Sequence, residues 1–433
     1  MTDTRRSEIN RPWPSTSVSR ARVRASATRN GTIKRVLHAP IPIAQAQELI
    51  AARVRPLDAE SVPLDEAGGR FLARPVDALI DLPSFDNSAM DGYAIRAADT
   101  PGRLTIVGES AAGAPFAGGV EPGQAIAIAT GAMLPRGADA VAPIEDVNVD
   151  GGLLEVPAAV AAGACVRYAG GDVKHGERLL SAGTRIGPAQ IGALAAVGLD
   201  LAPCRRRPRV AVFATGTELR PAGTDLKPGQ IFNSNAPMLR AALGSSGALI
   251  ERIPSVADTA EAHLAALTEA LEHDVVITSG GVSVGAHDLV RDAARRLGVE
   301  EVFWRVAIRP GKPLAFGVRG DTLVFGLPGN PVSTLVCFEL FVRPALLALQ
   351  GASDPSPQLS AGTLATSVRR NPERDDFIRV RTRRDSGTTI LEPLHDQQSH
   401  QIAIAAQADA LARIPAGDGE LQAGTPVSFL PIT

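Results

Sequence analysis

Hydrophobic positions follow helical spacing at two places in the first half of the chain. The first is IPIAQAQELIAARVRPL, which Pro56 ends, and the second is GERLLSAGTRIGPAQIGALAAVGL. Between them, residues 62–164 consist of short β-type runs separated by Gly and Pro turns. We therefore expect a small β module, 62–164, inserted into a discontinuous helical base made of residues 35–61 and 165–204.

Strands and helices alternate over residues 205–350. VAVFAT, DVVITS and TLVFGLP predict buried strands, whereas TAEAHLAALTEALE and HDLVRDAARRLG predict helices. This alternation favours a doubly wound, mostly parallel α/β domain. Residues 358–433 return to β-type runs such as FIRVRTRR and predict a C-terminal β-barrel-like domain. The fold class is thus α/β plus β in a multidomain chain.

Composition narrows the functional classes. The 433 residues are 45% hydrophobic, enough for about two to four domains. A net charge of -2 gives no overall field for nucleic acid, and no apolar run approaches the ~20 residues that span a membrane. Three widely spaced cysteines indicate free thiols in a reducing cytoplasm. Residues 1–34 predict a disordered basic tail, with a nucleic-acid-binding arm as the alternative.

Three glycine-rich or small-polar loops follow strands of the predicted α/β domain. They are ATGTEL (214–219), TSGGVSVGAHD (278–288) and GLPGNPVS (326–333). Ligands of open α/β sheets bind beyond the carboxyl ends of the strands. Gly280 and Gly281 would let backbone N–H groups approach a phosphate, and Ser279 and Ser283 would add hydroxyl donors. The alternative is that these are tight turns without a ligand.

Two acids accompany these loops. Glu218 and Asp288 each lie a few residues beyond a strand end, so they could converge on one crevice. Mg²⁺ is commonly held by one or two carboxylates together with phosphate oxygens, which predicts Mg²⁺ as the cofactor. The other interpretation of Asp288 is a carboxylate that complements a helix dipole.

Positive charge and candidate caps lie at two further strand ends. Arg309 and Lys312, separated by a Pro-Gly turn, would suit a small oxyanion, or else form a solvated turn. Asn330 precedes Pro331 and Asn235 opens another helix, so both are natural N-caps. Ser333 could cap or bind.

The β module contains the densest cluster of functional side-chain types. FDNSAMDGYA (85–94) combines two acids, an amide, a hydroxyl and a Tyr in one loop. A turn needs some of these residues but not this density, so we expect a functional loop that includes Asp86. Two further loops share its character, the Gly-Gly-Asp172 loop and TGAMLP (130–135).

These segments together resemble one family. FDNSAMDGYA, TGAMLP, Gly-Gly-Asp172, TGTEL, NSN, SGGVSVGAHD, RPGKPLAFG and GLPGNPVS occur in the order found in the MoeA family of molybdopterin molybdenumtransferases, related to the C-terminal domain of gephyrin. The resemblance spans residues 36–433. It implies an elongated, four-domain cytoplasmic homodimer whose active cleft lies between the α/β domain of one subunit and the β module of the other.

The resemblance also implies an activity. Adenylylated molybdopterin would bind with Mg²⁺, molybdate would be inserted at the dithiolene, and AMP would be released, as the last step of molybdenum cofactor synthesis. Transient contacts with the pterin adenylyltransferase and with apo-molybdoenzymes would follow. No nucleic acid or membrane is implied as a partner.

Site residues are carried over by matching positions. The acids Asp86, Asp172 and Glu218 would be catalytic, and Asp288 with Glu218 would hold the metal. The adenylylated pterin would contact Thr215, Gly216, Asn235, Asp258, Ser279, Gly280, Gly281, Ser283, Gly329 and Asn330. Molybdate would contact Arg309, Lys312, Pro313, Ser333, Arg379 and Ser399. Two positions depart from the family pattern: Arg309 replaces the usual lysine, and Gln398 replaces the usual glycine before Ser399-His400.

Three alternatives stay open. A pterin adenylyltransferase would have a similar α/β domain, but the β module with FDNSAMDGYA favours insertion. A non-catalytic scaffold, as in a gephyrin-like clustering role, would have no need of Asp86, Asp172 and Asp288 together. Tungstate is too similar to molybdate for the sequence to separate them.

Overall fold

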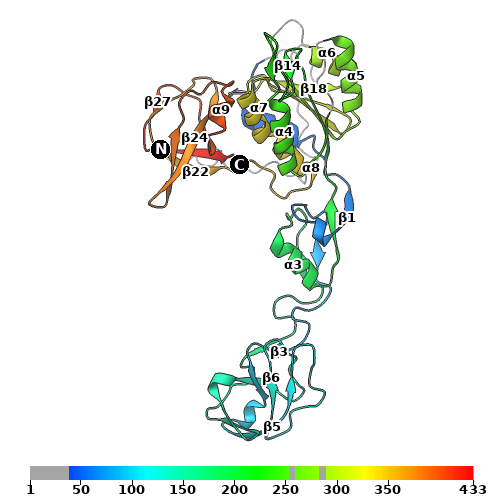
Figure 1. Ribbon diagram of the computed structural model, residues 1–433, viewed down its shortest axis with the longest axis vertical. Coiled ribbons are helices and arrows are strands. Elements are labelled where there is room, and N and C mark those ends of the chain that lie inside the picture. Colours follow the sequence, from blue (N-terminus) through cyan, green and yellow to red (C-terminus); the bar gives the residue numbers. More distant parts are fainter. Residues whose placement is uncertain (1–38, 253–258, 282–288, 433) are drawn as a thin grey trace, which may run out of the picture. The chain divides into compact units, whose positions relative to one another are not determined.

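The computed structural model describes residues 39–252, 259–281 and 289–432. The chain divides into two compact units. One is Ser61–Cys204, and the other combines Met1–Glu60 with Arg205–Thr433. The second unit holds the α/β sheet and the C-terminal barrel (Figure 1).

The Ser61–Cys204 unit contains the predicted small β domain. Its six-stranded sheet has the order β7-β4-β6-β5-β9-β8, in which only β5 and β6 pair in parallel. Neighbouring residues of β4 face opposite sides, since Ile95 packs into one apolar cluster and Ala94 into another. The strands are β4 (Gly92–Ile95), β5 (Gly102–Ser110), β6 (Gln124–Ile128), β7 (Ala140–Pro143), β8 (Asn148–Asp150) and β9 (Leu153–Val156).

The same unit has a second, smaller core around α3 (Pro188–Ala196). Pro188 occupies the first helical turn, and Gln190 accepts a hydrogen bond from the Gly187 N–H at 3.0 Å, so the helix start is capped. Leu194 packs with Leu72 and Ile186. The surrounding short strands are β1 (Ala59–Pro63), β2 (Val76–Asp77), β3 (Asn87–Ser88), β10 (Val166–Arg167), β11 (Arg178–Leu180) and β12 (Leu201–Arg205).

The α/β sheet has the order β16-β13-β17-β21-β20-β18. The strands β16, β13, β17 and β21 pair in parallel, whereas β20 pairs antiparallel with both β21 and β18. Their bounds are β13 (Arg209–Ala214), β16 (Leu249–Arg252), β17 (Val275–Ser279), β18 (Glu300–Trp304), β20 (Ala315–Arg319) and β21 (Thr322–Leu327). The sheet is therefore mostly parallel, as the alternation predicts.

Helices cover both faces of this sheet. Val210 and Val212 of β13 pack in one core with α4 (Asn235–Ser245), whereas Ala211 and Phe213 pack in another with α5 (Ala260–Ala270) and α6 (Leu289–Arg296). Figure 1 shows α4 apart from α5 and α6, on the other side of the sheet. On the α4 side, α7 (Pro331–Cys337), the π-helical turn Phe338–Val342 and α8 (Arg343–Leu349) complete the core. The stretch Pro331–Leu349 is apolar and long enough to span a membrane, but 72% of its most apolar 18-residue segment is buried inside the protein.

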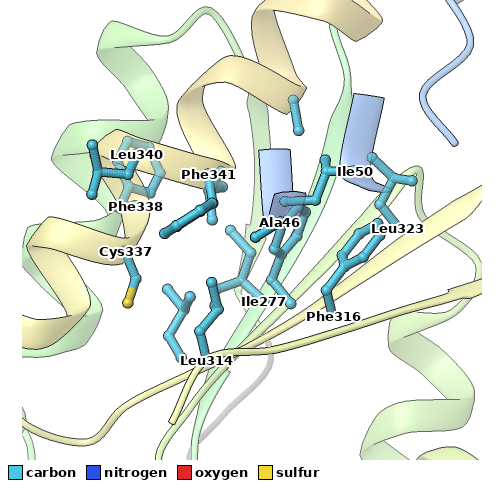
Figure 2. Close-up of a cluster of buried hydrophobic side chains, with 14 of the residues drawn as sticks. Ala46, Ile50, Ile277, Leu314, Phe316, Leu323, Cys337, Phe338, Leu340 and Phe341 are labelled. Carbon is cyan, nitrogen blue, oxygen red and sulfur yellow. The ribbon is translucent and has the colours of Figure 1, made fainter. Parts of the chain in front are cut away.

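The first helix packs against this core and not against residues 165–204. Figure 2 shows Ala46 and Ile50 of α2 (Ile43–Ala51) together with Ile277, Phe316 and Leu323 of the sheet. Ala46 and Ile50 are fully buried, as the helical spacing predicts. We expected this helix to form a helical base with residues 165–204. Its apolar face instead covers the α/β sheet.

The C-terminal region forms a closed five-stranded barrel. Its strands are β22 (Ser360–Leu364), β24 (Asp375–Asp385), β25 (Thr388–Pro393), β26 (Ala410–Ile414) and β28 (Pro426–Pro431), and pairing of β24 with β26 closes it. Val380, Leu391 and Ala410 are fully buried inside. Strand β19 (Ile308–Arg309), from the α/β region, pairs in parallel with the start of β24. The remaining elements are β14 (Leu219–Arg220), β15 (Ile231–Phe232), β23 (Val368–Arg369), α9 (Ile402–Ala405) and β27 (Glu420–Leu421).

Truncation of Ile50 tests whether α2 is part of the α/β core. Ile50→Ala should lower the free energy of unfolding by about 2–5 kcal/mol, because it removes a buried side chain and leaves a cavity. Denaturant titration measures this change. The control Glu48→Ala, at an exposed position of the same helix, should stay within about 0.5 kcal/mol of wild type. Equal, small effects of both substitutions would contradict the packing.

Candidate functional site

Three loops meet at the carboxyl edge of the α/β sheet. They follow β13, β17 and β21, which are neighbours in the sheet and parallel, so their ends lie side by side. The Thr215 N–H donates to the Ser279 carbonyl at 3.1 Å, and the Gly280 N–H donates to the Leu327 carbonyl at 3.1 Å. The structure thus brings the three predicted loops together.

Backbone contact between these loops requires glycine. Gly280 has a φ of +93°, and a Cβ there would lie 3.0 Å from both the carbonyl and the hydroxyl oxygen of Thr215. Gly329 is also close, because a Cβ added there would lie 3.8 Å from the Gly280 Cα. The absent side chain lets the loops close into one continuous wall.

Asn235 fastens two of the loops. Its side chain is 8% exposed, and its Nδ2 donates to Ser279 Oγ at 2.8 Å and to the Gly329 carbonyl at 2.7 Å. The expectation that Asn235 caps its helix is wrong. Asn233 Oδ1 instead accepts from the Ala236 N–H at 3.0 Å, which leaves Asn235 one residue inside the helix and free to face the loops.

The loops form one wall of an open pocket of about 1370 Å³. The predicted site residues that line it are Thr215, Gly216, Glu218, Asn235, Ser279, Gly280, Gly281, Arg309, Lys312, Pro313, Gly329, Asn330, Ser333 and Ser399. The structure therefore gathers most of the predicted pterin and molybdate contacts around one cavity. Their roles stay predictions.

The barrel provides the opposite wall of this pocket, through Arg374 and Gln397–His400. Asn330 connects the walls, because its Nδ2 donates to Ser399 Oγ at 2.8 Å. Although Asn330 occupies the N-cap position of α7, its side chain makes no capping hydrogen bond. The capping interpretation is therefore wrong for this residue as well, and Asn330 orients Ser399.

Arg379 supports the barrel wall from inside and does not line the pocket. Its side chain is only 1% exposed, and its guanidinium donates to the carbonyls of Asp396, Gln398 and Gln401 at 2.7, 3.1 and 3.1 Å. Burial lowers the pKa of this guanidinium. In this arrangement Arg379 shapes the loop that carries Ser399, and a direct contact with molybdate stays a prediction.

Arg309 forms an ion pair that the sequence did not predict. It lies opposite Asp376 in the β19–β24 pairing, and its Nη2 is 2.6 Å from Asp376 Oδ2. The Asp376 side chain is 2% exposed and that of Arg309 is 51% exposed. Burial raises the pKa of Asp376, whereas the charges of Arg309 and Arg374 lower it.

Glu218 is the predicted metal ligand that lies among the described residues, and it lines the pocket. Its carboxylate lies over Gly216, where a Cβ would be 2.6 Å from Oε2, and it makes no hydrogen bond or ion pair with described residues. Asp258, Ser283 and Asp288 lie outside the described residues. No group of three metal-ligating acidic, His or Cys side chains occurs in the described ranges. A single carboxylate still suits Mg²⁺, which keeps water and phosphate oxygens as its other ligands.

The Ser61–Cys204 unit gathers the other three motifs. The Leu134 N–H donates to the Asp86 carbonyl at 2.8 Å, and Asp86 Oδ1 accepts from the Ala169 N–H at 2.8 Å. Asp172 is exposed, and its N–H donates to the Leu82 carbonyl at 2.8 Å. Asp91 Oδ1 accepts from the N–H and hydroxyl of Thr130, which lowers the pKa of Asp91. FDNSAMDGYA, TGAMLP and the Gly-Gly-Asp172 loop are therefore neighbours in this unit.

Comparison with known families covers almost the whole chain. Residues 41–198 match the MoeA N-terminal region (domain I and II), residues 211–348 match a probable molybdopterin binding domain, and residues 361–432 match the MoeA C-terminal region (domain IV).

Individual relatives agree with these matches. Molybdopterin molybdenumtransferase 2 of Mycobacterium tuberculosis is 37% identical over 408 residues, 90% of this chain and 99% of the relative. The molybdopterin molybdenumtransferase of Synechococcus elongatus is 38% identical over 397 residues, 88% and 97% of the two chains. A crystal structure of the molybdopterin biosynthesis MoeA protein from Pyrococcus horikoshii superposes with a TM-score of 0.80 at 29% identity, covering 91% of this chain and all of that one.

Removal of the Arg309 charge tests the ion pair through the pH dependence of the free energy of unfolding. Because the pKa of Asp376 is raised on folding, the folded state holds the proton more tightly, and stability falls as pH rises through the folded pKa. Arg309→Gln removes a charge that lowers this pKa, so its destabilisation should be about 1–3 kcal/mol at pH 7, allowing for the exposure of Arg309, and smaller at acidic pH.

Denaturant titration at neutral pH and at acidic pH measures this difference. Arg319→Gln, an exposed substitution on β20, is the control and should have little effect at either pH. An equal loss of stability by Arg309→Gln at both pH values would show that Asp376 is not the group concerned.

Proposed function

Because the chain belongs to the MoeA family of molybdopterin molybdenumtransferases, we propose that it inserts molybdate into adenylylated molybdopterin with release of AMP. The family supports a transferase of molybdenum cofactor synthesis. In this proposal the pterin substrate is adenylylated, AMP is the leaving group and the reaction requires Mg²⁺.

The observation that carries the proposal is the two-walled pocket. Molybdate is a doubly charged oxyanion, and an adenylylated pterin carries a diphosphate, so the two substrates repel each other. Among the described residues, the pocket presents three cations, Arg309, Lys312 and Arg374, against one carboxylate, Glu218. The Gly280 backbone and the hydroxyls of Ser279 and Ser333 add neutral donors. Such a pocket can hold two anions together.

Residue roles follow from the position of each group in the pocket. Asn235 would keep the Ser279 and Gly329 loops at a fixed separation, so that the pterin phosphate meets preorganised donors. Lys312, on the turn after Arg309, would hold molybdate. Glu218, with Asp288 outside the described residues, would bind Mg²⁺, which would neutralise charge on the diphosphate.

Asp86 and Asp172 would act on the water that cleaves the phosphoanhydride. Asp86 uses Oδ1 for the Ala169 N–H, and Oδ2 has no hydrogen-bond partner among the described residues, so it could accept a proton from water. Hydrolysis breaks the P–O–P bridge, places the water oxygen on one phosphorus, and leaves AMP and the pterin phosphate. A homodimer in the cytoplasm, and transient contacts with the adenylyltransferase and apo-molybdoenzymes, belong to the same proposal.

The activity is tested with purified protein, adenylylated molybdopterin, Mg²⁺ and molybdate. AMP should appear only when molybdate and Mg²⁺ are both present, because the pterin must accept molybdenum as the anhydride is cleaved. Chromatography of the nucleotides measures it. If the protein instead consumes ATP and forms adenylylated pterin without molybdate, it is an adenylyltransferase and the proposal is wrong.

Asp86→Asn separates hydrolysis from binding. The amide oxygen can still accept from the Ala169 N–H, but it is a poor base, so the rate of AMP release should fall by about 100-fold or more with substrate affinity retained. Asp150→Asn, at an exposed position of the same Ser61–Cys204 unit, is the control and should keep the wild-type rate. Wild-type turnover by Asp86→Asn would remove Asp86 from the mechanism.

A further inference from the structure

A buried cysteine supports one of the turns that line the pocket. Cys337 is the last residue of α7 and is fully buried, and Figure 2 shows it in the same core as Leu314. It is not among the described residues that line the pocket. Its thiol donates to the Gly311 carbonyl, with 3.5 Å between sulfur and oxygen. Because Gly311 belongs to the turn from Arg309 to Pro313, Cys337 supports this turn from within the core.

The contact between Cys337 and Gly311 is tightly packed. Gly311 has a φ of +116°, and a Cβ there would lie 2.8 Å from Cys337 Sγ and 2.7 Å from Ile308 Cδ1. Burial raises the pKa of the Cys337 thiol, so the thiol stays protonated at neutral pH and keeps its donor. A thiol is only a weak donor, so packing of the sulfur against the Gly311 backbone supplies most of the contact.

A second hydrogen bond fixes the turn at the next residue. The Val306 N–H donates to the Lys312 carbonyl at 3.0 Å. The carbonyl groups that precede and follow the Lys312 Cα are therefore both held, one by Cys337 and one by Val306. Together these two contacts set the direction in which the Lys312 side chain leaves the main chain at the pocket.

Helix α7 connects this support to a second side chain of the pocket. Ser333 lines the pocket near the start of α7, and Cys337 follows four residues later. Residues four apart lie on the same face of a helix, one turn from each other. The face of α7 that brings Ser333 to the pocket therefore also holds Gly311, and the contact with Cys337 fixes how far the turn lies from Ser333.

We propose that Cys337 is a positioning residue, which sets the separation between Lys312 on the turn and Ser333 on α7. The role rests on the proposed function only for the identity of the anion that these two side chains would contact. A smaller side chain at this position would let the turn move toward the helix, and a ligand that needs both groups at a fixed spacing would then bind less tightly. The sulfur acts as a spacer and undergoes no reaction.

Hydrogen exchange tests the support without any ligand. Cys337→Ala removes the sulfur, so the Val306 N–H, which the Lys312 carbonyl protects, should exchange about 10-fold faster or more. Val336→Ala is the matched control, because it opens a cavity at a fully buried position of the same helix and leaves the thiol in place. It should destabilise the protein but keep the wild-type exchange at Val306. Mass spectrometry of peptides that contain Val306 measures the rate, and denaturant titration measures the stability of each variant.

Equilibrium dialysis with molybdate tests the consequence for the pocket. Cys337→Ala should bind molybdate about 10-fold more weakly, because the turn that carries Lys312 has moved. Val336→Ala should bind it like wild type. Cys337→Ser keeps a donor and most of the volume, so its affinity should lie closer to wild type than that of Cys337→Ala.

The two measurements separate this inference from the proposed function. Faster exchange at Val306 in Cys337→Ala alone supports the positioning role even if the wild-type protein binds no molybdate and releases no AMP, in which case the proposed function is wrong. Unchanged exchange at Val306 in Cys337→Ala, or an equal increase in Val336→Ala, would overturn the inference. Wild-type affinity of Cys337→Ala for molybdate, where the wild-type protein binds it, would overturn it as well.

Discussion

Parallel pairing of β13, β17 and β21 is the constraint on which the site depends. Because the three strands run the same way and are neighbours, three loops far apart in sequence end at one edge. Their approach is close enough that a Cβ at Gly280 would lie 3.0 Å from two oxygens of Thr215, and Asn235 uses both amide protons to hold the loops. The helices on the two faces of the sheet then supply the burial that keeps these strands in register.

The positive charge of the pocket is limited because an acid of the barrel pairs with one of its arginines. The barrel contributes Asp376, which forms a close ion pair with Arg309, and Arg374, which forms no ion pair with a described residue. Burying a carboxylate is unfavourable unless a cation compensates it, so Arg309 serves the fold as well as the cavity. An anion that enters meets a limited positive charge, which favours binding that can be reversed after reaction.

Sequence reasoning located the loops because strands, glycines and turn residues leave local patterns. It identified the parallel sheet and the small β domain, and most of the pterin and molybdate contacts that it predicted line one pocket. It failed for Asn235 and Asn330, whose positions beside helix starts indicate caps, because the partners of both side chains lie on distant loops. It also missed Asp376 and Arg374, which look like an ordinary charged run in ERDDFIRV. Asp376 pairs with Arg309 across β19 and β24, and Arg374 lines the pocket. Helix α2 was assigned to the wrong neighbours because its spacing shows which face is apolar but not what covers it.

The strand β19 makes the final barrel an inseparable part of the binding domain. Two residues of the α/β region pair with the start of β24, and the ion pair between Arg309 and Asp376 lies on that same pairing. A fragment that stops near residue 357 would lose the barrel wall of the pocket. It would leave β19 without its partner strand and Arg309 without its counterion Asp376. Dissecting this enzyme into autonomous modules should therefore cut at the Ser61–Cys204 unit and leave the last 75 or so residues attached.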